Sequence, residues 1–240
     1  MARLIRTAIV WLIVLGLSMI LYLAARDHLR RHPQDVPWTQ LSLADPQGIF
    51  TLRKLVGLRD DTARCRALIE AAGLDDGPAP PRRSGPDCGY ADGMRLQRDV
   101  DFAPAGLVTA CPVAAALHLL ERDVLHAAAM RHFGQPVRTI DHAGSYTCRR
   151  LYARADGPFS EHATANALDI LGLRLADGTS VSVLRDWSDP GPKGRLLREV
   201  RDGACGLFAT VLSPDYNEAH RDHLHFDMAS RGRSGFSVCR

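Results

Sequence analysis

The sequence lacks several patterns that mark common enzyme classes. It contains no Gly-rich phosphate-binding loop, no G-x-S-x-G nucleophile elbow and no internal repeat. These absences argue against phosphate-loop enzymes, α/β-hydrolases and repeat proteins. The chain of 240 residues is nevertheless 46% apolar, which is enough for a packed core and excludes a disordered protein.

A basic surface is also missing from the part of the chain that we expect to fold. The formal net charge is +3, but the first 31 residues already hold five arginines against one aspartate. The rest of the chain carries 25 basic and 26 acidic residues. Nucleic-acid binding requires a basic patch on the folded part, so we expect no nucleic-acid partner.

An uncharged apolar segment, residues 7–25, lies near the N-terminus. As a helix it is about long enough to cross a bilayer core, and it has no polar face. A cleaved signal peptide normally has a shorter apolar region, and Leu23-Ala24-Ala25 is only a weak cleavage signal. We expect an uncleaved transmembrane anchor preceded by a cytoplasmic N-terminus, residues 1–6. Arginines flank the segment on both sides, so charge alone does not fix its orientation.

The cysteines indicate the compartment. None forms a C-x-x-C pair, which argues against a zinc thiolate site. An even set of scattered cysteines behind an export-like segment favours up to three disulfides in an oxidising compartment, with buried free thiols as the alternative. We expect a single-pass inner-membrane protein with its C-terminal domain in the periplasm. The cysteines are Cys65, Cys88, Cys111, Cys148, Cys205 and Cys239.

The rest of the chain divides into a lead-in and one domain. Residues 26–60, with three prolines and mixed charge, are expected to be a linker and lead-in strand before a domain over residues 61–240. Periodicity and caps predict helices over residues 63–72, 112–133 and 195–208. Alternation and turn signals predict strands over residues 94–102, 137–140, 170–175, 180–184 and 210–212, and a loop over residues 75–86. The long helix carries His118, His126 and His132, which we interpret as ordinary helix residues.

Two segments carry the residue types of a metal site. His162 and Asp169 are seven residues apart, and Asp222-His223-Leu224-His225 follows about sixty residues later. Zn²⁺ takes imidazole and carboxylate ligands, and three protein ligands with an open fourth position are typical of a hydrolytic site. Strand alternation would direct His223 and His225 to one side. We predict that His162, Asp169 and His225 bind the ion.

Two further residues are candidates for substrate binding. A strand leading into a Gly-Ser-Tyr turn brings Arg149 close to the segment that carries His162. A guanidinium there could take a substrate carboxylate through two parallel hydrogen bonds, although a solvated or structural arginine is the alternative. Ser160 is a candidate to bond either the substrate or a ligand of the metal.

These motifs resemble a known group of enzymes. Ser160-x-His162, Ala167-x-Asp169 and Asp222-His223-x-His225 look like the motifs of zinc D-Ala-D-Ala peptidases and murein endopeptidases, which share a fold with hedgehog domains. Residues 61–227 are more closely similar to the bacterial extensin-like C-terminal domain family. The resemblance implies an α+β fold of the hedgehog/DD-peptidase type, with helices around a small antiparallel sheet that carries the zinc ligands.

The resemblance also implies a catalytic base just before the last ligand. The candidates are Asp222 and His223. Asp222 is one methylene shorter than the glutamate usual in the peptidases, which favours His223. A second departure is Ala165, where the peptidase motif commonly has glycine.

The function implied is that of a membrane-anchored zinc metallopeptidase that hydrolyses amide bonds in peptidoglycan peptides with metal-activated water. One alternative is a non-catalytic cell-envelope binding domain that keeps the peptidase-like cleft. Another is a structural envelope protein with coincidental histidines.

Overall fold

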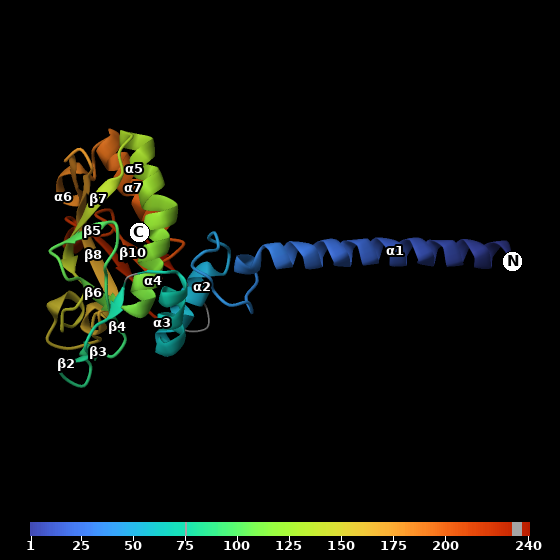
Figure 1. Ribbon diagram of the computed structural model, residues 1–240, viewed down its shortest axis with the longest axis horizontal. Helices are drawn as coiled ribbons and strands as arrows, with labels where there is room; N and C mark the ends of the chain where they lie inside the picture. Colours follow the sequence, from blue (N-terminus) through green and yellow to red (C-terminus); the bar gives the residue numbers. More distant parts are fainter. Residues whose placement is uncertain (75, 232–236) are drawn as a thin grey trace.

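The computed structural model describes residues 1–74, 76–231 and 237–240. A mixed α+β domain follows a single long N-terminal helix that projects away from it (Figure 1). The α+β class predicted from the sequence is therefore confirmed. The relation to the hedgehog/DD-peptidase fold stays a prediction.

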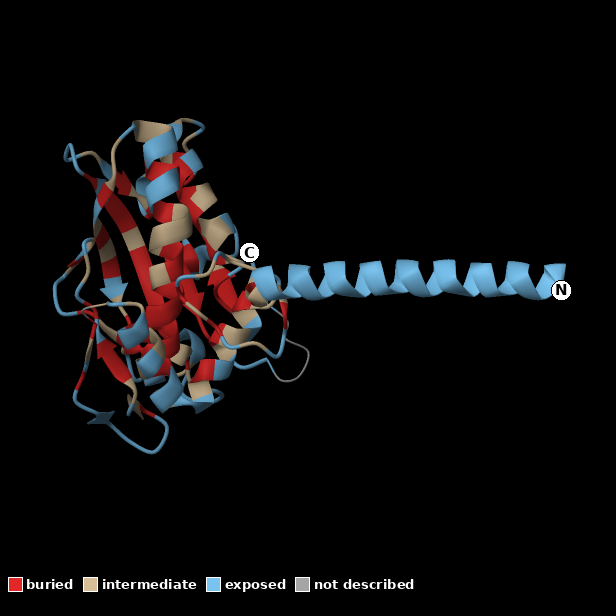
Figure 2. Ribbon diagram, turned by 45° about the vertical axis from the view of Figure 1, so that its right-hand side comes forward, coloured by how far each residue is buried: buried red, intermediate tan, exposed pale blue. Residues whose placement is uncertain are grey.

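The projecting helix α1, Ala2–Arg31, contains the predicted apolar segment. Its mean hydropathy reaches 2.5 over 18 residues, and no residue along it is buried (Figure 2). Apolar side chains without protein contacts are stable in lipid but not in water. The helix is long and apolar enough to cross a membrane, which is compatible with anchoring; a signal sequence shares these properties.

The main sheet of the described residues has seven strands, with β8 at its centre. β8 pairs antiparallel with β7, β9 and β11, whereas β5 joins β7 and β12 joins β10 in parallel. The strands are β5 Asp101–Ala103, β7 Val137–Gly144, β8 Ala167–Leu175, β9 Ser180–Ser182, β10 Thr210–Leu212, β11 Leu224–Asp227 and β12 Val238–Cys239.

Helices pack along one face of this sheet (Figure 1). α4 is apolar on almost every side and is buried at the centre of the domain, whereas α7 buries one face formed by Leu196, Leu197 and Val200. The helices are α2 Thr51–Val56, α3 Thr62–Ala71, α4 Cys111–Leu120, α5 His126–Phe133, α6 Val183–Asp186 and α7 Pro192–Ala204. Alternate residues of β8 and β11, including Leu168 and Phe226, point into this core. The opposite face of these strands is left for polar side chains.

Two small sheets and several short turns complete the domain. One sheet joins β1 Gly77–Pro78, β4 Gly93–Arg95 and β6 Val108–Ala110, and the other joins β2 Arg82–Arg83 with β3 Gly89–Tyr90. The 3-10 helices are η1 Pro33–Asp35, η2 Gly57–Asp60, η4 Leu151–Ala153, η5 Glu161–Thr164 and η6 Glu218–His220.

Several boundaries differ from the sequence prediction. The single strand predicted over residues 94–102 is two strands, β4 and β5, separated by irregular chain. The predicted loop 75–86 contains β1 and β2, and residue 75 lies outside the described residues. The helix predicted over residues 195–208 begins earlier and ends at Ala204, and the long helix is interrupted by a π-helical segment, η3 Glu121–Leu125.

The lead-in to the domain was also predicted wrongly. The expected strand within residues 26–60 is helical, because α1 extends to Arg31 and α2 occupies Thr51–Val56. Leu41, Leu43 and Leu55 from this segment are buried in the domain core. Much of the segment therefore packs as part of the fold.

All six cysteines form disulfides, as the sequence predicted. The pairs are Cys65–Cys111, Cys88–Cys148 and Cys205–Cys239. The first joins α3 to α4, the second joins the segment before β3 to the chain after β7, and the third joins the end of α7 to β12. Three separate parts of the domain are thus covalently closed.

Packing of the core-facing side chains of β11 should dominate the stability of the domain. Phe226 is fully buried, and its ring stacks on Phe208 with 5.0 Å between ring centroids. Phe226→Ala should lower the free energy of unfolding by about 3–5 kcal/mol, measured by denaturant titration. The matched control is Leu184→Ala on exposed α6, which should change it by less than about 0.5 kcal/mol. Equal effects of the two substitutions would contradict this account of the core.

Candidate metal centre

Strand pairing brings two of the predicted ligands together. In the antiparallel pair β8–β11, Asp169 stands directly opposite His225, while Leu168 is opposite Phe226. Since side chains alternate along strands, Leu168 and Phe226 face the core, and Asp169 and His225 share the other face. The hydrophobic pattern that buries one face therefore also sets the register of the polar pair.

The third predicted ligand, His162, comes from the short turn η5 just before β8. Ser160 caps this turn, its Oγ accepting the His162 backbone N–H at 3.3 Å. The turn ends at Ala165, which has φ of 55° in the left-handed region. This conformation accounts for the glycine expected here from the resemblance, since glycine adopts it without the steric cost that a Cβ adds.

Hydrogen bonds fix the polypeptide around His162. The carbonyl of Ala165 accepts from the Ala110 N–H at 2.8 Å and from the Ser145 hydroxyl at 2.9 Å. The carbonyl of His162 accepts from the Thr147 N–H at 3.0 Å. This turn is therefore held by β6 and by the chain after β7.

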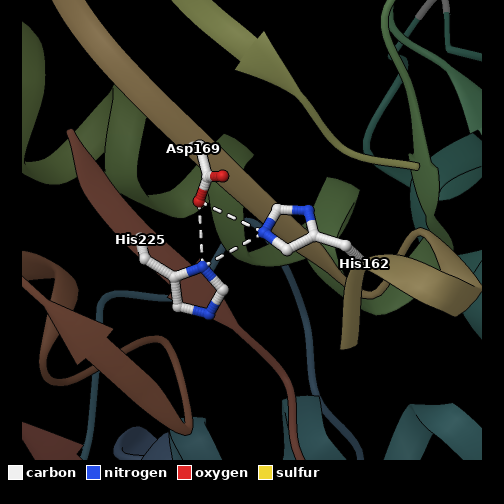
Figure 3. A group of neighbouring side chains, drawn as sticks. All are labelled: His162, Asp169 and His225. Carbon is white, nitrogen blue, oxygen red and sulfur yellow. Dashed lines mark hydrogen bonds and ion pairs between the residues drawn. The ribbon is translucent and has the colours of Figure 1, made fainter. Parts of the chain in front are cut away.

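The three side chains converge on one point (Figure 3). His162 Nε2 and His225 Nδ1 lie 3.2 and 2.9 Å from Asp169 Oδ1, and 3.2 Å from each other. All three residues are buried, with at most 8% of their surface exposed. The structure thus brings together His162, Asp169 and His225, the set named from the sequence; these three have the residue types and spacing of a possible metal site.

The outer nitrogens of both rings have partners of their own. His162 Nδ1 donates to the backbone carbonyl of Ser145 at 2.7 Å, and His225 Nε2 donates to Asp227 Oδ2 at 3.0 Å. In a neutral imidazole only one nitrogen carries a proton, so both inner nitrogens present lone pairs to the Asp169 carboxylate. Three acceptors then face one another, an arrangement that requires a cation between them or a proton on one ring.

The pKa shifts of His225 and Asp169 also indicate that the triad requires a positive charge. Burial alone lowers the pKa of His225, but the adjacent carboxylates of Asp169 and Asp227 outweigh it and raise the pKa to about 9. Burial raises the pKa of Asp169, but hydrogen bonds from His162 and His225 overcome it and hold that pKa far below its usual range. The site therefore favours positive charge next to an ionised Asp169.

The two candidates for the base form a pair beside the triad. His223 Nδ1 donates to Asp222 Oδ1 at 2.8 Å, and His223 Nε2 lies 3.6 Å from Asp169 Oδ1. This hydrogen bond from His223 lowers the pKa of Asp222. His223 is the nearer of the two to the ligands, and Asp222 fixes its ring.

A cavity of about 680 Å³ opens next to the triad. Of the predicted site residues, it is lined by Arg149, Ser160, His162, His223 and His225. Asp169 and Asp222 are not among its lining residues. Arg149 is exposed, and the backbone N–H of Ser160 donates to its carbonyl at 3.0 Å.

Two residues at this site were missed by the sequence analysis. Asp227, which orients His225, continues the alternation of His223 and His225 and could have been found from it. His220, also in the cavity wall, donates from Nδ1 to Asn217 Oδ1 at 2.7 Å. Burial, aided by the neighbouring His223 and His225, lowers its pKa to about 4, so it is neutral near pH 7.

The family model described as extensin-like protein C-terminus matches residues 63–240, about three-quarters of the sequence. No curated protein and no solved structure matches the chain. The predicted resemblance to the extensin-like family is confirmed, and the relationship to zinc peptidases remains a prediction.

Removing one ligand should abolish zinc binding. We expect His162→Ala to retain less than about 1% of the wild-type zinc affinity, because two remaining ligands cannot complete a three-residue site. Zinc content after dialysis of the full chain in detergent measures this. The control is His126→Ala, which removes an exposed imidazole on α5 and should leave zinc content unchanged. Full zinc occupancy in His162→Ala would refute the ligand assignment.

Without metal, the stability of the domain should fall as the pH rises. The pKa of His225 is about 9 in the folded chain and near 6.5 when unfolded. Its contribution is therefore complete below about pH 6.5 and is lost towards pH 9, which amounts to about 3 kcal/mol. Denaturant titrations with a chelator should show this decline, and His225→Gln should flatten it. A free energy of unfolding that rises between about pH 6.5 and pH 9 would contradict protonation of His225 in the folded, metal-free chain.

Proposed function

The chain belongs to the extensin-like protein C-terminus family, and we propose that it is a membrane-anchored zinc peptidase acting on peptidoglycan peptides. The observation that supports this most strongly is the convergence of His162 Nε2, His225 Nδ1 and Asp169 Oδ1 beside an open cavity. Zinc enzymes that hydrolyse amides use three such ligands and an open fourth position.

The donors fit a divalent ion on three counts. The donor groups are two imidazoles and one carboxylate. Both rings are oriented by hydrogen bonds from their outer nitrogens. When the rings are neutral, three acceptor atoms face each other with no proton between them. A zinc ion held by His162, Asp169 and His225 supplies Lewis acidity that acidifies water and polarises a peptide carbonyl.

His223 is suited to act as the general base. Its Nδ1 proton is donated to Asp222, which leaves the Nε2 lone pair free on a side chain that lines the cavity. Nε2 lies 3.6 Å from the Asp169 oxygen that faces the two ligand nitrogens, so it can accept a proton from water next to the metal. Asp222 is then a positioning residue that fixes the ring and its tautomer, as a carboxylate does for many catalytic histidines.

Arg149 and Ser160 are the residues that we expect to bind the peptide. Arg149 is exposed in the cavity wall and pairs with no carboxylate among the described residues. An exposed guanidinium that pairs with no carboxylate of the protein can bind a substrate carboxylate. The Ser160 hydroxyl accepts the His162 N–H and keeps its own proton available for a substrate oxygen.

The location follows from the same proposal. Helix α1 would anchor the chain in the inner membrane, and the three disulfides favour a periplasmic position for the domain. A peptidase in this position meets the peptide part of the cell wall.

Loss of His223 should separate chemistry from metal binding. His223→Ala should reduce hydrolysis of purified muropeptides by about 10²–10⁴-fold, as expected for loss of a general base, and should retain its zinc. Asp222→Asn, which keeps the size of the side chain, should cause a smaller loss. Mass spectrometry of the products, with and without a chelator, measures the effect.

The control for this prediction is His118→Ala on α4, which should hydrolyse muropeptides as the wild type does. Wild-type products that do not depend on the chelator would contradict the metal mechanism. Zinc binding without any products would instead favour a non-catalytic binding domain.

A further inference from the structure

A second cavity adjoins the one beside the triad. It has a volume of about 880 Å³ and lies between the chain from Pro81 to Ala91 and the segment that contains Arg150 and Gly157. Pro158 and Phe159 line both cavities, so these two residues form a shared wall. A ligand that extends from the metal site over this wall enters the second cavity, which we call the arginine groove.

The groove is rich in positive charge. Arg82, Arg83 and Arg150 line it against one acidic side chain, Asp87. Among the residues that the structure describes, none of these three guanidinium groups has a carboxylate oxygen within 4.0 Å. The domain as a whole is close to neutral, so this local excess is a property of the groove.

Two of the guanidinium groups are held in place by aromatic rings. The Cζ atom of Arg82 lies 4.3 Å from the ring centroid of Tyr146, and that of Arg150 lies 4.3 Å from the ring centroid of Phe159. Stacking fixes the guanidinium plane. Arg150 Nη1 also donates to the carbonyl of Gly157, and the remaining N–H groups are left for a ligand. These arginine side chains are therefore already ordered in the free protein, so less side-chain entropy is lost when a ligand binds.

A disulfide ties this groove to the metal centre. Cys88 lies between Arg83 and β3, and its partner Cys148 directly precedes Arg149 and Arg150. Arg149 faces the cavity of the triad, while Arg150 faces the arginine groove. Positive groups thus continue from one cavity into the next along a covalently fixed wall.

We propose that the arginine groove binds a carboxylate-bearing stretch of the same peptide whose amide bond lies at the metal centre. Carboxylates match the forked N–H groups of arginine, and the shared wall lets one extended peptide occupy both cavities. The identity of this ligand rests on the proposed peptidase function. The groove would select acidic peptides over their amidated forms.

The test compares two peptides that differ in one group. The probes are fluorescent L-Ala-γ-D-Glu-L-Lys-D-Ala-D-Ala and the same peptide with the glutamate α-carboxylate amidated. Binding to the full zinc-loaded chain in detergent is followed by fluorescence polarisation in a His223→Ala background, which prevents turnover. We expect the acidic peptide to bind about tenfold more tightly, and salt to weaken this preference.

Charge-removing substitutions then locate the preference. R82Q/R83Q should reduce the affinity for the acidic peptide at least tenfold and that for the amidated peptide less than twofold, and R150Q should act in the same direction. The control R138Q/R185Q removes two exposed arginines elsewhere and should change neither affinity. Thermal midpoints and zinc content are compared to confirm that all variants are folded.

The outcomes separate this inference from the proposed function. Equal affinity for the two peptides, or an equal loss of affinity in R138Q/R185Q, would refute peptide binding by the arginine groove. Hydrolysis by the chain that retains His223 could still be observed, so the proposed function would stand. Selective binding that depends on Arg82 and Arg83, without hydrolysis by the chain that retains His223, would support carboxylate binding by the groove and refute the proposed peptidase activity.

Discussion

Antiparallel pairing of β8 with β11 is the constraint on which the candidate site depends. Its register sets Asp169 against His225 on one face and Leu168 against Phe226 on the other. A slip of one residue would send the ligands into the core and the apolar residues into the cavity. The free energy of burying Phe226 and its neighbours therefore also holds the polar face in place, which is why a short, four-residue strand can carry a precise site.

The polar face is balanced by charge. Asp169 and Asp227 flank His225 on its two nitrogens, and Ser145 holds the outer nitrogen of His162. Two carboxylates match the charge of one divalent cation while both imidazoles stay neutral. A single proton leaves a net negative site, and a buried unbalanced charge is costly. The charges of these groups would therefore suit a doubly charged ion, as would their donor atoms.

The sequence predicted those parts that follow a local pattern. Alternation in β11 and the apolar run in β8 give the strands, and the motif spacing gives the three residues that meet. The paths of short connections depend on distant contacts, so β4 and β5 were merged and a lead-in strand was expected within residues 26–60, where the chain is helical. His220 was missed because the fold brings its ring next to that of His223, and the hydrogen bond that His223 donates to Asp222 depends on side-chain geometry. The arginine groove arises where residues 81–91 meet residues 150–159, a proximity that no periodicity encodes.

The disulfides are distributed unevenly with respect to the site. Cys88–Cys148 secures the arginine-bearing wall, and Cys205–Cys239 secures β12, whose Val238 lines the triad cavity. Asp169 and His225 are joined by the hydrogen bonds between β8 and β11, whereas His162 stands on η5, whose backbone is held by Thr147, the neighbour of Cys148. Reduction of the disulfides would therefore loosen the arginine-bearing wall and the backbone support of His162 before it loosens the Asp169–His225 pair. In a reducing environment the pairing of β8 with β11 would persist, while the segments around Cys148 and Cys239 would gain freedom to move.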